Sequence, residues 1–370
     1  MKRFLPAMAV AGLLSACSGD GTNPFDEPVD PTADPSTVNS KFVYDFEDKL
    51  TMNAVTYDAD DNVLLINNLP FDGPDGRYEY RRTQGNVDIY RSLQTPTTGQ
   101  VRSYAVFMKN DDAEVTAAVG ERWIDFGYAG ANVKRGSFNL PSGVGEYLYL
   151  GSYGGVRTRN DGASIELVSG DATLVFDALD FDSTATGDED ATIEGAIVGY
   201  VDNRLRTNAA GAVIDEQLPT ISLILVQYDP ETGTFDGTVN TGFNGSVRDT
   251  GEWGGLIAGA EGDTIGAHLV MTGTAEMQVV NYEVLTWVDP VTSEETTISA
   301  YSSDADFTRI NQQVNNGEAV ETLLVDRSGI PAGATITSRL EEITFESAAD
   351  AREVGVILTE REPTDLTPIP

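Results

Sequence analysis

The stretch EYLYLGSYGGV, residues 146–156, decides the fold class of this 370-residue chain. An aromatic residue or a glycine recurs at every second position, which places on one face of an extended strand Tyr147, Tyr149, Gly151, Tyr153 and Gly155. Large residues that alternate with glycine on one face are typical of small closed barrels, where strands bend sharply and side chains crowd the interior. The stretch therefore predicts a barrel strand.

Similar alternation continues downstream and is interrupted by turn signals such as Asp229-Pro230-Glu231-Thr232-Gly233. We predict a small antiparallel eight-stranded β-barrel over residues 137–273. Its strands are expected at 146–156, 164–168, 171–179, 192–201, 221–228, 234–240, 251–260 and 264–272.

The rest of the chain is also strand-rich and has no long helical periodicity, so the predicted fold class is all-β. Residues 42–136 are expected to form a β region that precedes the barrel. Residues 274–360 are expected to form a C-terminal β extension, and residues 361–370 a tail. Within the extension, strands are predicted at 276–288, 296–301, 320–326, 335–345 and 354–358, with one short helix at 304–315.

The N-terminus has the pattern of an exported protein. Lys2 and Arg3 precede an apolar run at residues 4–14, which is too short to span a bilayer as a helix and fits a signal peptide over residues 1–16. The following Leu14-Ser15-Ala16-Cys17 resembles the lipobox of bacterial lipoproteins. An ordinary signal peptide with an incidental cysteine is the alternative.

The lipobox resemblance implies that Cys17 is lipidated, with palmitate among its acyl chains, and that it anchors the chain in a membrane. Each buried CH₂ of an acyl chain contributes about 0.8 kcal/mol of membrane affinity. Ser18 favours the outer membrane, since related lipoproteins kept at the inner membrane often carry Asp there. Residues 17–41 are rich in proline and acids, and are expected to be a disordered tether.

The composition restricts the partners. With 59 Asp and Glu against 23 Lys and Arg, the net charge is −36, so nucleic acid is not an expected partner. The charge is explained either by solubility in a salty medium or by a surface for a basic partner or calcium. Cys17 is the only cysteine, so no intramolecular disulfide can form.

The predicted barrel resembles a known family over roughly residues 121–273. The order of glycine and aromatic positions is similar to the barrel domain of transferrin-binding-protein-B-like surface lipoproteins of Gram-negative bacteria. Residues 42–136 then correspond to the "handle" of that family, and the resemblance implies display on the cell surface and protein ligands. The chain departs from the family pattern at Gly254-Gly255-Leu256-Ile257 and at Gly266-Ala267-His268. The matching stretches are Leu140-Pro141-Ser142-Gly143, Gly151-x-Tyr153-x-Gly155, Gly170-Asp171-Ala172-Thr173-Leu174, Ile193-x-Gly195, Gly233-Thr234-Phe235-x-Gly237 and Gly251-x-Trp253-x-Gly255.

No motif predicts catalysis or cofactor binding, and we expect no enzyme, no cofactor and no metal. The single histidine, His268, has no nucleophile marked beside it, and is expected to have no catalytic role. Asp58-x-Asp60-x-Asn62 begins like a calcium loop but lacks the later glycine and glutamate, so a polar hairpin turn is preferred. The acids of residues 180–190 are expected to form a solvated loop. Trp123, Trp253 and Trp287 are expected in the core.

These features together predict a lipid-anchored outer-membrane protein, exposed at the cell surface, that binds a protein or solute ligand. The alternatives are a calcium-assisted carbohydrate-binding β-sandwich and, third, a glycoside hydrolase. The ligand surface is expected on loops and on the handle-like region of residues 42–136. The longest loops in the barrel are expected at residues 202–218 and 241–250. Their arginines Arg204, Arg206 and Arg248 either pair locally with Asp202, Asp215 or Asp249, or bind an acidic partner.

Overall fold

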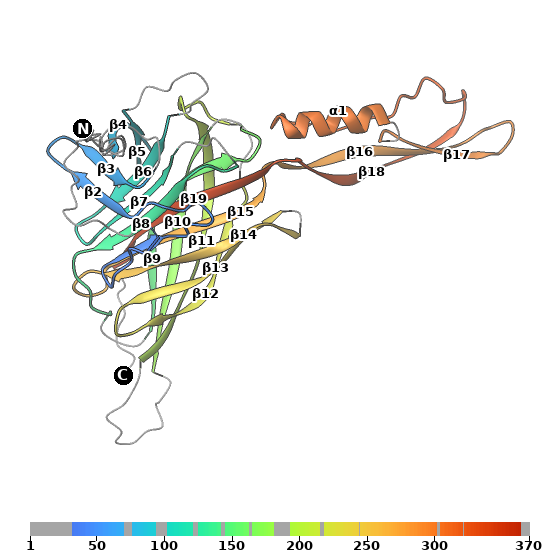
Figure 1. Cartoon of the computed structure of the whole chain (residues 1–370). Helices are drawn as coiled ribbons and strands as arrows, with labels where there is room; N and C mark the ends of the chain where they lie inside the picture. Colours follow the sequence, from blue (N-terminus) through green and yellow to red (C-terminus); the bar gives the residue numbers. More distant parts are fainter. Residues whose placement is uncertain are drawn as a thin grey trace, which may run out of the picture.

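The computed structural model describes residues 32–69, 76–93, 102–120, 125–141, 145–162, 165–180, 193–214, 218–243, 245–301, 304–320 and 322–363. These residues form three antiparallel sheets and one helix, so the all-β prediction is confirmed. Figure 1 shows a sheet that lies against one side of a barrel, and a narrow arm that projects from the barrel. Cys17 lies outside the described residues.

The N-terminal sheet has eight strands in the order β1-β8-β7-β6-β5-β4-β3-β2. Strands β2 to β8 follow one another as a meander, and β1 pairs with β8 at the other edge. The strands are β1 (Ser40–Val43), β2 (Ala54–Asp58), β3 (Val63–Asn67), β4 (Arg77–Gln84), β5 (Val87–Ser92), β6 (Tyr104–Lys109), β7 (Ala113–Val119) and β8 (Ala129–Arg135).

Successive side chains of a strand point to opposite faces of the sheet. Both faces of this sheet carry apolar side chains, because its strands have apolar residues at successive positions. On β6, Val106 belongs to the cluster that packs on the outside of the barrel and that also contains Val354 and Val356 of the barrel. Its neighbour Phe107 points to the other face, into a separate cluster with Tyr90. Apolar residues of β1 and of β5 to β8 on this face pack against the barrel, which joins the sheet and the barrel into a single packed unit.

The barrel is closed, with the strand order β10-β11-β12-β13-β14-β15-β19-β9. The prediction of an eight-stranded antiparallel barrel is thus confirmed. Its strands are β9 (Gly145–Arg159), β10 (Glu166–Asp180), β11 (Ile193–Asn208), β12 (Ile221–Asp229), β13 (Thr234–Phe243), β14 (Ser246–Ala258), β15 (Thr264–Thr274) and β19 (Asp350–Arg361).

The predicted barrel span, residues 137–273, is wrong at its C-terminal end. The described parts of the runs predicted at 164–168 and 171–179 lie in one continuous strand, β10, or directly before it. The pairing of β10 with β11 shifts register between Ser169 and Asp171. The span therefore holds seven barrel strands. The eighth is β19, which pairs with β15 and β9 and closes the barrel. Residues 275–349 are inserted between the last two barrel strands, so they are not a C-terminal extension.

The inward glycines make room for aromatic rings, as the alternating pattern suggests. Gly155 and Gly355 pair across β9 and β19, and the ring of Tyr153 lies over both. A Cβ atom on Gly355 would lie 2.3 Å from Tyr153 Oη, and one on Gly155 would lie 2.5 Å from it. The large and small residues of the sequence pattern therefore complement each other inside the barrel.

We call residues 275–349 the arm. It consists of a three-stranded sheet in the order β17-β16-β18, with one face covered at its base by helix α1. The helix predicted at 304–315 is confirmed. Of the strand predicted at 320–326, the described residues 320 and 322–326 form only an isolated bridge at Leu323. The elements are β16 (Met277–Val288), β17 (Glu295–Ser299), α1 (Asp304–Asn315) and β18 (Thr335–Glu346).

Candidate functional site

The three arginines predicted in barrel loops are all buried. Arg204 and Arg206 lie on β11, which continues well past Asp202, and Arg248 lies near the start of β14. The loop assignment is therefore wrong, because both strands are longer than their apolar pattern suggested. Both strands were predicted too short at these ends because their inward positions change there from apolar to charged residues.

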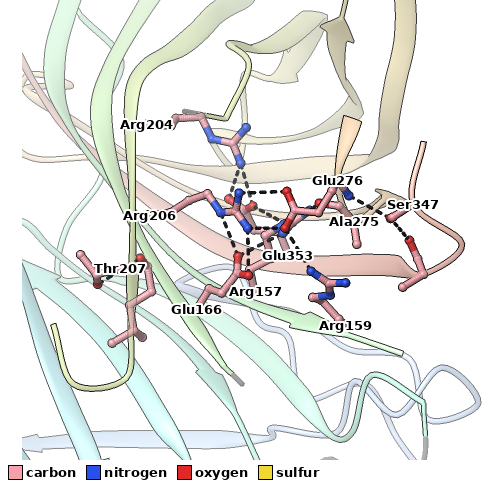
Figure 2. A network of polar contacts seen from close by, with 12 residues as sticks. Arg157, Arg159, Glu166, Arg204, Arg206, Thr207, Ala275, Glu276, Ser347 and Glu353 are labelled. Atoms are coloured by element: carbon pink, nitrogen blue, oxygen red, sulfur yellow. Dashed lines mark hydrogen bonds and ion pairs between the residues drawn. The ribbon is translucent and has the colours of Figure 1, made fainter. Parts of the chain in front are cut away.

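Arg204 and Arg206 belong to a network of charged side chains inside one end of the barrel (Figure 2). Arg206 lies 2.9 Å from Glu166 and 2.7 Å from Glu276. Arg204 lies 2.6 Å from Glu353, whose Oε1 also accepts a hydrogen bond from Tyr153 Oη. The network is completed by two further arginines on β9. Arg157 lies 3.0 Å from Glu166, and Arg159 lies 3.1 Å from Glu276.

Glu353 and Arg206 of this network remain ionised although both are buried. Burial opposes ionisation of Glu353, but Arg204 and Arg157 outweigh it and hold the pKa of Glu353 below its usual value. Burial likewise disfavours the charged form of Arg206, but Glu166 and Glu276 raise the pKa of Arg206 above its usual value. Loss of one partner would leave its counterpart charged in a dry interior, which is strongly destabilising.

This network also holds the root of the arm. Glu276 immediately precedes β16, and the carbonyl of Ala275 accepts hydrogen bonds from Arg157 at 2.6 Å and from Arg248 at 2.8 Å. Arg159 donates to the carbonyl of Asn315, the last residue of α1, at 3.1 Å. Charged groups from β9, β11 and β14 thus fix where the arm leaves the barrel.

Two buried arginines join the N-terminal sheet to the barrel in reciprocal fashion. Arg135, on β8, donates to the carbonyls of Ile257 and Thr232 on the barrel side, each at 2.6 Å. Arg352, on β19, donates to the carbonyls of Asp48 and Gly127 on the sheet side, at 2.7 and 2.6 Å. Burial lowers the pKa of Arg352 to about 10, so it remains charged at neutral pH.

A pocket of about 860 Å³ lies beside this contact, between the sheet and the outer surface of the barrel. Its floor is formed by residues of β13, β14 and β15, and one wall is formed by residues 42–45, 47–50 and 125–127 of the N-terminal sheet region. A volume of this size is in the range of small-molecule sites, roughly 300–1,000 Å³.

His268 lines the pocket and is 8% exposed. Neither ring nitrogen has a hydrogen-bond partner within the described part of the chain. Burial lowers the pKa of His268 to about 4, so the imidazole is neutral at physiological pH. His268 is the single histidine of the sequence, but its place at a pocket could not be predicted, because one wall of the pocket comes from a distant part of the chain.

The other candidate residues have different outcomes. Asp58 Oδ1 accepts the backbone N–H groups of Asp60 and Asp61 in the turn between β2 and β3, so this stretch is a polar hairpin turn, as preferred. Residues 181–190 and Trp123 lie outside the described residues. Trp253 is in the barrel core, whereas Trp287 is half-buried on the arm.

No group of three or more His, Cys, Asp or Glu side chains is arranged to hold a metal ion in the described ranges. Among the same residues there is also no helix with the length and apolar character needed to cross a membrane. A scan against protein-family models gave no match, and a search of curated proteins found no significant similarity.

Proposed function

We propose that this protein is a lipid-anchored, non-catalytic binding protein of the outer membrane, exposed at the cell surface, whose arm presents a surface to a protein ligand. The proposal includes lipidation at Cys17 and membership in the transferrin-binding-protein-B-like surface lipoproteins. The eight-stranded barrel with a second sheet packed against it agrees with that resemblance. The observation that carries the proposal is the fixed projection of the arm from the barrel (Figure 1).

The arm exposes apolar side chains on the sheet face opposite α1. Ile336 and Leu340 of β18 lie on the same face as Trp287, as the pairing of Trp287 with Ile336 and of Glu283 with Leu340 requires. Leu340 is 61% exposed and Ile336 is 45% exposed. A half-buried tryptophan beside exposed aliphatic residues is the composition found at the centre of protein interfaces.

The rigidity of the arm root favours recognition. A binding surface held in one position loses less conformational entropy on association than a mobile loop does. Here the root is held by Glu276 in the buried network and by Ser347, whose backbone N–H donates to the carbonyl of Glu276 at 2.9 Å. The arm can therefore present Trp287 and its neighbours away from the barrel in a defined orientation.

The test is a comparison of ligand capture by wild-type protein and by a variant without the arm. Met277 and Glu346 are paired directly across β16 and β18, so residues 278–345 can be replaced by Asn-Gly, a two-residue hairpin turn. This variant keeps Glu276 and Ser347 at the barrel end, and it removes the hydrogen bond from Arg159 to the carbonyl of Asn315. A protein captured from the surroundings of the bacterium by wild type should be lost from the armless variant.

Two leucine substitutions separate the arm surface from general stickiness. Leu340 on β18 and Leu225 on β12 have nearly equal exposure, 61% and 62%. Leu340→Asp should reduce capture at least tenfold, whereas Leu225→Asp should leave capture unchanged. Equal capture by wild type, the armless variant and Leu340→Asp would place the ligand surface elsewhere and contradict the role of the arm.

A further inference from the structure

The pocket between the N-terminal sheet and the barrel contains a row of three residues in which a glycine separates two polar residues. Asp236 on β13, Gly254 on β14 and His268 on β15 are directly paired across the three strands. All three are on the outer face of the barrel, because their neighbours Phe235, Trp253 and Leu269 belong to the core.

Glycine in the middle of this row is needed for the position of the carboxylate. A Cβ atom on Gly254 would lie 2.4 Å from Asp236 Oδ1, so the carboxylate of Asp236 extends over Gly254, the residue that separates it from His268. Lys41 of β1 lies 2.8 Å from the other carboxylate oxygen, Oδ2. Asp236 is therefore held in place by the N-terminal sheet while keeping acceptor capacity for a further donor.

His268 is the second polar group of the row and is not satisfied by the protein. A buried imidazole without hydrogen bonds is costly, by about 1–3 kcal/mol, and such groups in a pocket call for a functional explanation. A neutral imidazole has one nitrogen that accepts and one that donates. Both ring nitrogens are buried, so a bound molecule provides the missing donor when the ring turns toward the pocket that His268 lines.

The charged side chains of the pocket lining indicate whether a neutral or a positively charged hydrogen-bond donor is favoured as the ligand. Three basic side chains lie at the pocket, and each is engaged. Arg352 donates to backbone carbonyls, Lys49 pairs with Asp125 at 2.8 Å, and Lys41 pairs with Asp236 at 2.8 Å. The acids therefore exceed the bases, and the surface of the pocket favours a positively charged ligand. The acidic side chains of the lining are Asp45, Glu47, Asp48, Asp125, Asp236 and Glu252.

We propose that this pocket binds a small organic cation whose ammonium or guanidinium N–H groups donate to the imidazole of His268 and to the carboxylate of Asp236. The neutral imidazole accepts one N–H without charge repulsion, and the carboxylates of the wall compensate the positive charge. This site lies between the sheet and the barrel, so it goes beyond the proposed role of the arm and does not depend on it.

The direct test uses the fact that His268 is the only histidine. In full-length protein labelled with ¹⁵N-histidine, the imidazole signals report on this residue alone. Butane-1,4-diamine and agmatine should shift these signals saturably at roughly physiological ionic strength, whereas butane-1,4-diol should not. Binding of the diamine that leaves the His268 signals unchanged would overturn the proposal, as would the absence of saturable binding of either cation.

Calorimetric titration of the same cations into variants gives the second readout. Asp236→Asn and His268→Leu should each weaken diamine binding at least tenfold, and Glu295→Ala, at an exposed acid of the arm, should have no effect. If His268→Leu does not fold, the Asp236→Asn titration and the wild-type NMR experiment still decide the question. Unchanged affinity in Asp236→Asn would contradict the site. Equal binding of the diol or of glucose would indicate a hydroxyl or saccharide site, and preferential binding of calcium chloride would indicate a metal site; each would overturn the proposal.

Discussion

The guanidinium of Arg206, on barrel strand β11, lies 2.7 Å from Oε1 of Glu276, the residue that precedes the first strand of the arm. Both side chains are about 1% exposed, so this ion pair joins barrel and arm in a dry environment. Glu276 also pairs with Arg159, so its removal would take one of two carboxylates from each arginine. Arg206 would keep Glu166, and Arg159 would keep the partly exposed Asp161.

Glu276→Ala is therefore expected to destabilise the protein by about 3–5 kcal/mol, the cost of removing one partner from a buried ion pair. Urea denaturation followed by tryptophan fluorescence measures this. Glu295→Ala, an exposed acid on β17, is the control and should change stability by less than about 0.5 kcal/mol. If both variants unfold at the same urea concentration, the network does not hold the arm.

Gly355→Ala should disturb the barrel interior. The new methyl group would lie 2.3 Å from Tyr153 Oη, so the ring must move and its hydrogen bond to Glu353 must break or lengthen. The expected loss is about 1–3 kcal/mol, as for overpacked cores. Gly136→Ala is the matched control, because no atom lies within 4 Å of its added Cβ. An unchanged free energy of unfolding in Gly355→Ala would show that the barrel interior around Tyr153 is loosely packed.

The stability of the protein should depend on pH through His268. Unfolded histidine titrates near pH 6.5, and burial lowers the pKa of His268 to about 4, so between these values the unfolded chain binds a proton that the folded protein does not. The contribution to stability is complete above pH 6.5 and is lost as the pH falls toward 4. The loss amounts to about 2 kcal/mol by pH 5 and about 3 kcal/mol over the whole range.

His268→Gln isolates this contribution, since it retains a neutral polar side chain and all carboxylates of the protein. Urea denaturation at pH 7.5 and at pH 5 should show that wild type loses about 2 kcal/mol more than His268→Gln does on acidification. Identical losses in the two proteins would mean that His268 is accessible to protons in the folded state.

Cys17→Ala should release the protein from the membrane fraction, because the proposed lipid is its only expected anchor. Labelled palmitate should enter wild type and not the variant. Antibody binding to intact cells should detect wild type if the protein is displayed at the cell surface. Membrane association of Cys17→Ala that equals that of wild type would contradict lipid anchoring at this residue.

Much of the fold could be predicted from local sequence. The alternation of Tyr147, Tyr149 and Tyr153 with glycine predicted barrel strands because a strand that faces a crowded interior needs both large and small residues. Helix α1 was predicted at its observed bounds, and the Asp58 turn was predicted as a hairpin. These features depend on residues that are close together in the chain, so periodicity and turn chemistry are sufficient to reveal them.

Closure of the barrel and the polar sites were decided by tertiary structure. Strand β19 pairs with β15, although the 75 residues of the arm separate the two strands in the sequence. No local pattern encodes a partner that is so distant in sequence. Arg204 and Arg206 were predicted in a loop because a charged side chain is usually exposed. Their burial is possible only because carboxylates distant in sequence, such as Glu353 and Glu276, pair with them. His268 was evident in the sequence as the single histidine. Its burial beside a pocket depends on the packing of the N-terminal sheet against the barrel, which brings together residues separated by more than two hundred positions.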